Sequence, residues 1–480
     1  MKQSMKRIGF CQITFKQSLI VKNMIKRYSN ICAIGIGYLF IFIGFQAQVM
    51  AFSVPPIDNK VSSEVALKWG LMSLQILKNT PNGSPTYGSR SLAYLGLTMY
   101  ECVVAGDIQK QSLAGQLKGL NTLPKAQKGK VYNWVLSLNA GQAFLLKQLY
   151  NHTSLENVRK IDSLENAVYQ QELIHTDKKV AESSKVLGLS IAAAIFEWSK
   201  TDGGFEGYNR NFDPAYQMPT AKGFWKAPAK GQSAFAMPLH PYWGQNRTFA
   251  PLNGVIPIPR MITYDYHPNS EYYALMNEVY LKRKTLTQEE KEIANWWGDD
   301  PSQTFSPPGH SYNLANIAVK IANPSLFKAA ETYAKVGMAV ADAFINCWKA
   351  KYFYNAQRPF SFIYYNIDNQ WDLYWPEPPF PAFYSGHAVQ GSATAVVLTE
   401  LYGANFQFTD DSHVGRAKDL ERNTEYKARH FKSFWAAAEE SAMSRLYGGI
   451  HTRQDNEVGL VEGKKIGKNI NALAWNKISK

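Results

Sequence analysis

Apolar residues recur at three- and four-residue intervals through most of this chain, which places them on one face of an α-helix. In the stretch 178–200, Leu187, Ile191, Ile195 and Trp198 fall on such a face. The spacing predicts helices over residues 61–79, 88–105, 130–150, 154–175, 178–200, 269–284, 287–297, 309–322, 325–351, 386–402, 411–447 with a break, and 453–474. No alternating strand pattern persists, so we expect an all-α fold of two packed helical bundles.

One long segment, 201–268, interrupts the helical pattern. It is rich in Pro, Gly and aromatic residues, and five prolines forbid a helix there: Pro238, Pro241, Pro251, Pro257 and Pro259. We therefore predict that 201–268 is an ordered connecting loop. It would join an N-terminal helical half, 52–200, to a C-terminal helical half, 269–480.

The first residues of the chain, 1–51, have the pattern of an export signal. Lys26 and Arg27 precede an apolar stretch that ends near Phe45, and small or branched side chains follow up to Ala51. We predict a signal peptide cleaved after Ala51 and a periplasmic or secreted protein, with Met24 as an alternative start. An uncleaved anchor is the alternative, although the stretch is shorter than the roughly 20 residues that span a membrane. No comparable run follows, so no integral membrane domain is expected after signal removal.

Composition indicates a globular chain with a modest positive charge. Of 480 residues, 45% are hydrophobic and 19% charged, which allows a large core. The formal net charge is +14, but 1–51 holds seven basic residues and no acidic one, which leaves about +7 for the rest. Because no concentrated basic stripe or nucleic-acid-binding module is present, no nucleic-acid partner is predicted. Cys102 and Cys347 allow one disulfide or two buried thiols.

Three charged clusters in the last third of the chain have the residue types of an oxyanion pocket. They are Lys351 with Arg358-Pro359, Ser385-Gly386-His387, and Ser444-Arg445 with His451 and Asp455. The cations suit the oxygens of phosphate-like groups, and arginine offers paired donors. Ser385 is expected near a helix N-cap, and the amide of Gly386 would add the favourable end of a helix dipole. Together these groups predict a pocket for a tetrahedral oxyanion, in which preorganised positive charge is the main catalytic device.

The two histidines of these clusters supply different chemistry. Asp455 lies four residues after His451, so its carboxylate can orient the imidazole and keep one ring nitrogen protonated. The other nitrogen of His451 is then free to attack or to coordinate the central atom. His387 is the predicted general acid or base.

The three clusters resemble the tripartite motif shared by vanadium-dependent haloperoxidases, bacterial acid phosphatases and type 2 phosphatidic acid phosphatases. In this sequence the motif reads Lys351-x6-Arg358-Pro359, Ser385-Gly386-His387 and Ser444-Arg445-x5-His451-x3-Asp455, with Tyr384 where the family usually has proline. The resemblance implies a haloperoxidase-like fold and a vanadate site, with His451 as the vanadium ligand. The residues that would bind the oxyanion are Lys351, Arg358, Ser385, Gly386 and Arg445, and Lys351 would also polarise the bound oxidant.

Two neighbouring features resemble the haloperoxidase branch of this superfamily. The run Pro378-Pro379-Phe380-Pro381-Ala382-Phe383 is similar to the segment before Ser-Gly-His in fungal chloroperoxidases, and Trp348 stands where those enzymes have a halide-pocket tryptophan. Trp348 and Phe380 would then form an apolar halide pocket, ordinary aromatic packing being the alternative.

A segment upstream of the motifs resembles the part of the family that supplies a carboxylate to the motif arginine. It is Trp296-Trp297-Gly298-Asp299-Asp300 with Pro307-Pro308. The resemblance implies that Asp299 pairs with Arg445. A helix-ending turn is the alternative interpretation.

Three functions are compatible with the sequence. The first is an exported vanadate-dependent haloperoxidase that oxidises a halide with hydrogen peroxide to hypohalous acid. The second is a soluble acid phosphatase with a phospho-His451 intermediate, which would bind phosphate in place of vanadate. The third is a non-catalytic phosphate-binding protein of the cell envelope. The aromatic pair Trp348 and Phe380 favours the first.

Overall fold

The computed structural model describes residues 61–227, 231, 237–300 and 303–477, which belong to one compact unit. The predicted signal peptide, its cleavage after Ala51 and the alternative start at Met24 lie outside the described residues and stay predictions. The boundaries proposed near residues 200 and 268 also stay predictions.

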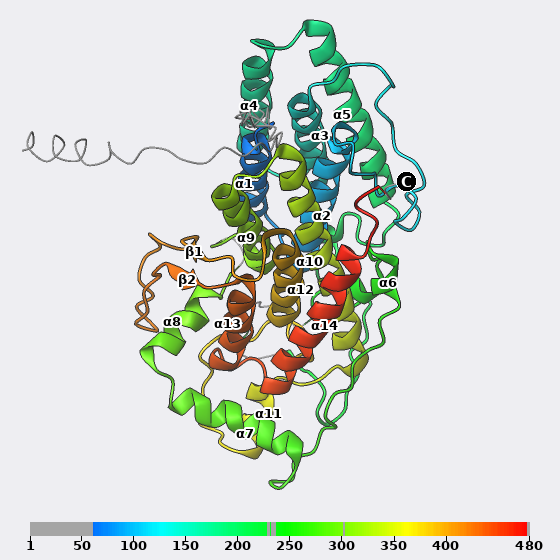
Figure 1. Cartoon of the computed structure of the whole chain (residues 1–480). Coiled ribbons are helices and arrows are strands. Elements are labelled where there is room, and N and C mark those ends of the chain that lie inside the picture. The colour runs from blue at the N-terminus through cyan, green and yellow to red at the C-terminus, as the bar shows by residue number, and fades with distance from the viewer. Residues whose placement is uncertain (1–60, 228–230, 232–236, 301–302, 478–480) are drawn as a thin grey trace, which may run out of the picture. The chain divides into compact units, whose positions relative to one another are not determined.

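Helices dominate the described chain, which confirms the expected all-α class (Figure 1). Before the Pro-rich connection come α1 (Glu64–Asn79), α2 (Pro85–Glu101), η1 (Val104–Gly106), α3 (Trp134–Leu149), α4 (Leu155–Leu173) and α5 (Lys178–Ser199). Within or after it come η2 (Gly207–Asn209), η3 (Trp243–Gln245), α6 (Pro251–Gly254), α7 (Glu271–Lys284), α8 (Gln288–Trp296), α9 (Ser306–Ala322), α10 (Leu326–Tyr354), α11 (Pro359–Asn366), α12 (Gly386–Tyr402), α13 (Phe434–Tyr447) and α14 (Arg453–Asn471). Strands β1 (Phe408–Asp410) and β2 (Arg429–Phe431) form an antiparallel pair.

Side-chain caps explain why several helices begin where the sequence pattern places them. The Asp177 carboxylate accepts hydrogen bonds from the amides of Lys179 and Val180 and so starts α5. Thr287 and Glu290 form a capping box at the start of α8. Each cap satisfies amides that have no partner inside the helix, so a polar residue just before an apolar periodic stretch fixes the boundary.

Helices α2 and α10 pack so closely that their contact requires glycine. A Cβ added at Gly96 would lie 2.3 Å from the carbonyl oxygen of Tyr333, and one added at Gly337 would lie 2.7 Å from that of Leu92. The two backbones therefore touch where these helices cross. Because α10 also carries Lys351 in its last turn, this packing fixes the helix that presents the first motif.

We expect Gly96→Ala to lower the free energy of unfolding by about 2 kcal/mol or more, because the new methyl group must push two backbones apart. Denaturant unfolding of the purified protein measures this loss. Gly391→Ala in α12 is the matched control, since its Cβ would meet Ala438 at an ordinary 3.5 Å. An equal loss for the two variants would contradict the close-packing explanation.

Helix α14 lies directly on α12, which brings the second and third motifs together (Figure 1). A Cβ at Gly463 would lie 2.4 Å from the carbonyl oxygen of Val389, and the hydroxyl of Ser392 donates to the carbonyl oxygen of Leu460 at 2.6 Å. At the start of both helices, the amide of Ser385 donates to the carbonyl oxygen of Asp455 at 3.0 Å. The two helix starts therefore share one corner of the fold.

Three predicted elements differ from the structure. The helix expected over 411–447 is wrong before Phe434, because the chain there forms turns with positive φ at Gly415 and Asn423 and then β2, which pairs with β1 just upstream. The connection 201–268 holds the short helix α6, which begins at Pro251, where proline is tolerated. Helix α11 begins at Pro359 in the same way and was not predicted.

Two further findings bear on the sequence-based expectations. Cys102 and Cys347 are free and buried, so the disulfide alternative is wrong. Of the helices in the described ranges, none combines the length and the apolar character needed to cross a bilayer.

Candidate active site

One cavity of about 560 Å³ collects residues from the second and third motifs and the predicted aromatic pair. Its lining includes Trp348, Phe380, Gly386, His387, Arg445 and His451. The N-terminal half and the Pro-rich connection also contribute to the wall, through Ser84, Asn211 and Leu239. The cavity is therefore built from both halves of the chain, whereas the motifs come from the C-terminal half alone.

Lys351 and Arg358 are fully buried, and neither is among the residues that line this cavity, but both lie against the ring of Phe380, which does line it. The ammonium group of Lys351 donates to the carbonyl oxygens of Pro381 and Ala382 at 2.9 and 2.7 Å, and lies 5.2 Å from the ring centroid of Phe380. Burial, reinforced by the charge of Arg358, lowers the pKa of Lys351 to about 8. A bound anion would therefore stabilise the charged form of Lys351.

The guanidinium of Arg358 links the first motif to the third. Its Nε donates to the carbonyl oxygen of Phe380 at 3.0 Å and its Nη1 to that of Ile450 at 2.8 Å. Nη2 is buried and has no hydrogen-bond partner among the described residues. Burial lowers the pKa of Arg358 to about 10, which leaves it charged at neutral pH. A buried charged donor without a partner is costly, and an oxyanion would satisfy it.

The second motif forms the start of α12. Ser385 is the N-cap and accepts from the amide of Ala388, while a Cβ added at Gly386 would meet no atom within 4 Å. Gly386 and His387 line the cavity, so the start of a 17-residue helix faces it. Backbone amides and the helix dipole at such a position favour an anion.

His387 has a nitrogen available for chemistry. Its Nε2 atom is buried and has no hydrogen-bond partner in the described part of the chain. Burial and the charge of Arg445 lower the pKa of His387 well below its ordinary value, so the ring is neutral near pH 7. A neutral imidazole that lines the cavity can accept a proton there.

His451 presents a lone pair on Nε2. Arg358 Nη1 lies 3.4 Å from this nitrogen, and a guanidinium can only donate, so Nε2 is the acceptor. The ring proton then sits on Nδ1 and is donated to the Asp455 carboxylate at 3.0 Å. Burial, followed by the charges of Arg358 and Lys351, lowers the pKa of His451 well below its ordinary value. The predicted orientation of His451 by Asp455 is therefore what the structure shows.

Asp455 also caps helix α14, a role that the sequence analysis did not predict. It stands third in α14 and accepts from the amide of Thr452 at 3.0 Å, while the Thr452 hydroxyl caps the helix in return. The same oxygen that orients His451 thus also fixes the helix start. Burial raises the pKa of Asp455 above its usual value.

Trp348 and Phe380 form an aromatic wall of the cavity. Their ring centroids lie 4.8 Å apart, and both side chains are among its lining residues.

Arg445 also lines the cavity. Its Nη2 donates to the carbonyl oxygen of Trp297 at 2.8 Å, and its Nε donates to the hydroxyl of Ser444 at 3.1 Å. Burial lowers the pKa of Arg445 to about 10, so it stays charged at neutral pH.

In sequence and in fold, this chain is similar to vanadium-dependent haloperoxidases. The family model described as the second helical-bundle domain of VCPO matches residues 331–480. A crystal structure of a bacterial vanadium-dependent iodoperoxidase is 32% identical, with a TM-score of 0.73, and the match covers 87% of this chain and 98% of that one. This chain belongs to the vanadium-dependent haloperoxidase family.

Two other relatives agree with this family at lower coverage or identity. The vanadium chloroperoxidase of Curvularia inaequalis is 27% identical over 213 residues, a match that covers 33% of this chain and only 35% of that enzyme. A bacterial vanadium-dependent chloroperoxidase of known structure is 14% identical with a TM-score of 0.63, over 82% of this chain and 92% of that one. At that identity the likeness shows the fold alone.

The pairing of Asp299 with Arg445, predicted from the family resemblance, is wrong. The two oxygens of Asp299 are hydrogen bonded to His310 Nδ1 at 2.8 Å and to His413 Nε2 at 3.1 Å. Asp299 occupies the left-handed region with φ of 50°, which turns its side chain toward these rings. It still lines the cavity and attracts Arg445 through space.

The histidines around Asp299 were missed from the sequence. His310 lies between two carboxylates, with Nε2 2.7 Å from Asp410. Burial alone would lower the pKa of His310, but Asp299 and Asp410 outweigh it and raise this pKa to about 10. In the chain, His310 lies 11 positions from Asp299 and 100 positions from Asp410. No spacing rule connects residues that far apart.

Proposed function

We propose that this protein is an exported haloperoxidase that binds vanadate and oxidises a halide with hydrogen peroxide to hypohalous acid. Membership of the vanadium-dependent haloperoxidase family supports the cofactor and the reaction class. Export rests on the sequence of residues 1–51, and N-terminal sequencing of the secreted protein tests it, with Phe52 as the expected first residue.

The observation that carries this proposal is the unprotonated Nε2 of His451 beside buried cations that form no direct ion pair within the described residues, although Glu377 and Asp455 attract Arg358 through space. Within the described chain, neither Lys351 nor Arg358 forms an ion pair with a carboxylate, and Arg358 Nη2 has no partner. A tetrahedral oxyanion would offset the cost of burying these charges, while a neutral imidazole nitrogen suits coordination of its central atom. The residues present therefore fit vanadate.

The roles of the side chains follow from their positions. Lys351, Arg358 and Arg445 would hold the oxygens of the oxyanion, assisted by the amide of Gly386 and the hydroxyl of Ser385. His451, oriented by Asp455, would hold the vanadium atom. His387 would take up the proton of the peroxide as it binds. Bound vanadate would supply Lewis-acid activation of the peroxide without a change in its oxidation state.

The aromatic wall favours a polarisable halide. Trp348 and Phe380 line the same cavity as His387, so an apolar surface lies beside the site where the oxidant would form. Large, weakly hydrated anions lose little solvation at such a surface. Since the iodoperoxidase relative covers most of this chain, we propose iodide as the preferred halide.

Reconstitution of the purified apoprotein with orthovanadate tests the proposal. We expect peroxide-dependent oxidation of iodide, and more slowly of bromide, only after vanadate is added. Excess phosphate should inhibit reconstitution because both anions compete for the same cations. Phosphate-ester hydrolysis in the absence of halide oxidation would favour the acid phosphatase instead. Vanadate binding without either activity would favour the non-catalytic alternative.

A further inference from the structure

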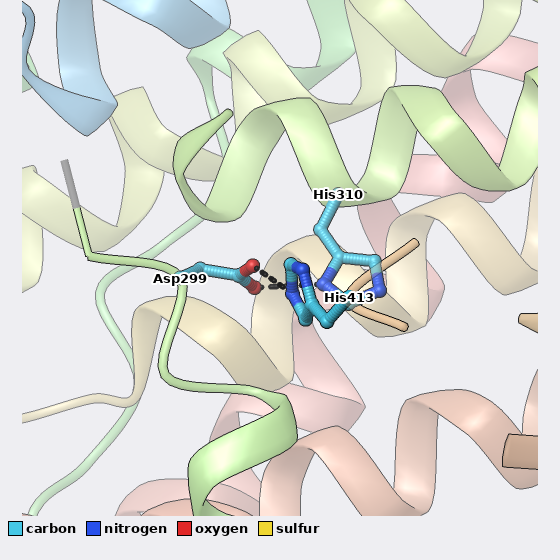
Figure 2. A group of neighbouring side chains, drawn as sticks. All are labelled: Asp299, His310 and His413. Atoms are coloured by element: carbon cyan, nitrogen blue, oxygen red, sulfur yellow. Dashed lines mark hydrogen bonds and ion pairs between the residues drawn. The ribbon is translucent and has the colours of Figure 1, made fainter. Parts of the chain in front are cut away.

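Asp299, His310 and His413 form a buried cluster next to the proposed vanadate site (Figure 2). They come from three separate segments: the loop after α8, helix α9 and the turn after β1. One carboxylate oxygen and one nitrogen from each ring all lie within 4.8 Å of one another. Figure 2 shows the carboxylate facing both imidazoles.

This combination of side chains is typical of transition-metal sites. Two imidazoles and one carboxylate are a ligand set that zinc and related divalent ions use, with the fourth position open in reactive sites. A tetrahedral ion with bonds of about 2.1 Å separates its ligand atoms by about 3.4 Å. His310 and His413 contact different oxygens of Asp299, at 2.8 and 3.1 Å, and the three ligand atoms lie within 4.8 Å of one another, so side-chain adjustments would bring them to the spacing of such an ion.

A second carboxylate supports the cluster from outside. Asp410 lies 2.7 Å from His310 Nε2, on the side of the ring that faces away from Asp299. Asp410 is itself held by the indole N–H of Trp296 at 3.0 Å. A carboxylate behind a histidine, fixing which ring nitrogen faces the metal, is the usual arrangement around metal-binding histidines.

Charge also favours a divalent cation at this position. Asp299 and Asp410 are buried carboxylates on either side of His310, and a divalent ion would replace the ring proton of His310 and balance the same two negative charges. Asp299 also lines the 560 Å³ cavity, so a fourth ligand, water or a small solute, has space on that side.

We propose that Asp299, His310 and His413 form a binding site for a divalent transition-metal ion of the zinc type, with Asp410 orienting His310. The site adjoins the vanadate pocket, because Asp299 lines the same cavity, and it does not depend on the proposed peroxidase activity. The ring of Trp297 stacks on His310 at 4.3 Å, and its carbonyl oxygen accepts from Arg445. An ion bound here would therefore link the loop after α8, helix α9 and the turn after β1 next to Trp297, whose carbonyl oxygen binds Arg445.

Zinc alone is the probe that tests this site. The protein, freed of any histidine tag and stripped with a chelator, is titrated with Zn²⁺ in the absence of vanadate. We expect one additional tightly bound zinc ion per chain compared with His413→Gln, with zinc affinity at this site at least about 100-fold weaker in the variant. Zinc should also raise the melting temperature of the wild-type protein more than that of the variant.

A matched substitution and a spectroscopic measurement complete the test. His267→Gln removes an exposed histidine and should leave the zinc stoichiometry of the wild type unchanged. Zinc X-ray absorption on the unaltered protein should show imidazole ligands at about 2.0 to 2.1 Å, a readout that does not depend on whether His413→Gln folds. Equal zinc binding by wild type and His413→Gln, or absorption without imidazole scattering, would overturn the proposal. Failure of vanadate reconstitution would contradict the proposed function but not the proposed zinc site.

Discussion

We expect His451→Ala to weaken vanadate binding by about 100-fold or more and to reduce halide oxidation to the level of free vanadate. His451 offers an imidazole lone pair to Arg358, with its other nitrogen donating to Asp455. Without the imidazole, Arg358, Lys351 and Arg445 would still attract the anion. They would not bond its central atom. Equilibrium dialysis with vanadate, followed by the iodide assay, measures both effects.

His430→Ala is the control for this prediction. His430 is exposed on β2, and its ring nitrogen bonds to the Thr409 hydroxyl on the neighbouring strand, so its loss should change neither vanadate affinity nor turnover. Circular dichroism and the melting temperature show whether His451→Ala keeps the native fold. If a folded His451→Ala binds vanadate as tightly as the wild-type protein, His451 is not the ligand and the proposed function loses its main support.

The sequence was most informative where a local rule acts on its own. Helix α5 was predicted at 178–200 and runs over Lys178–Ser199, because one apolar face and the Asp177 cap both act within a single segment. The bond between His451 and Asp455 was predictable for the same reason, since four residues span one helical turn. Features of this kind need no knowledge of the rest of the fold.

Features that depend on tertiary packing were not predictable in this way. The strands β1 and β2 have three residues each, too few for an alternating pattern, and the rings of Phe408, Phe431 and Phe434 pack there only once the chain has folded. A helical spacing of apolar residues before Phe434 was therefore misleading. Short strands are defined by their partners, whereas the helices here are defined by their own sequence.

The error at Asp299 has a similar origin. The resemblance correctly indicated a carboxylate near Arg445, but two adjacent acids, Asp299 and Asp300, were available. Which of them faces Arg445 depends on the left-handed backbone of Asp299 and on His310 and His413 in distant segments. The charge of Arg445 acts on Asp300 more strongly than that of any other charged group, although burial raises the pKa of Asp300 overall. Both acids therefore attract Arg445 through space, while the hydrogen bonds of Asp299 go to the two histidines.

We expect His387→Ala to lower the turnover of halide oxidation by about 10² to 10⁴ while vanadate affinity changes by less than about 10-fold. His387 lines the cavity, and its unpartnered Nε2 is free to accept a proton, whereas the anion is held mainly by the cations and His451. Its pKa is depressed well below 6.5, so the wild-type enzyme should lose activity only as the pH falls through that low value. The variant should lack this acidic limb of its pH profile. Steady-state kinetics across pH, together with vanadate dialysis, separate the two effects, and a parallel loss of vanadate binding and turnover would show instead that His387 serves to bind the cofactor.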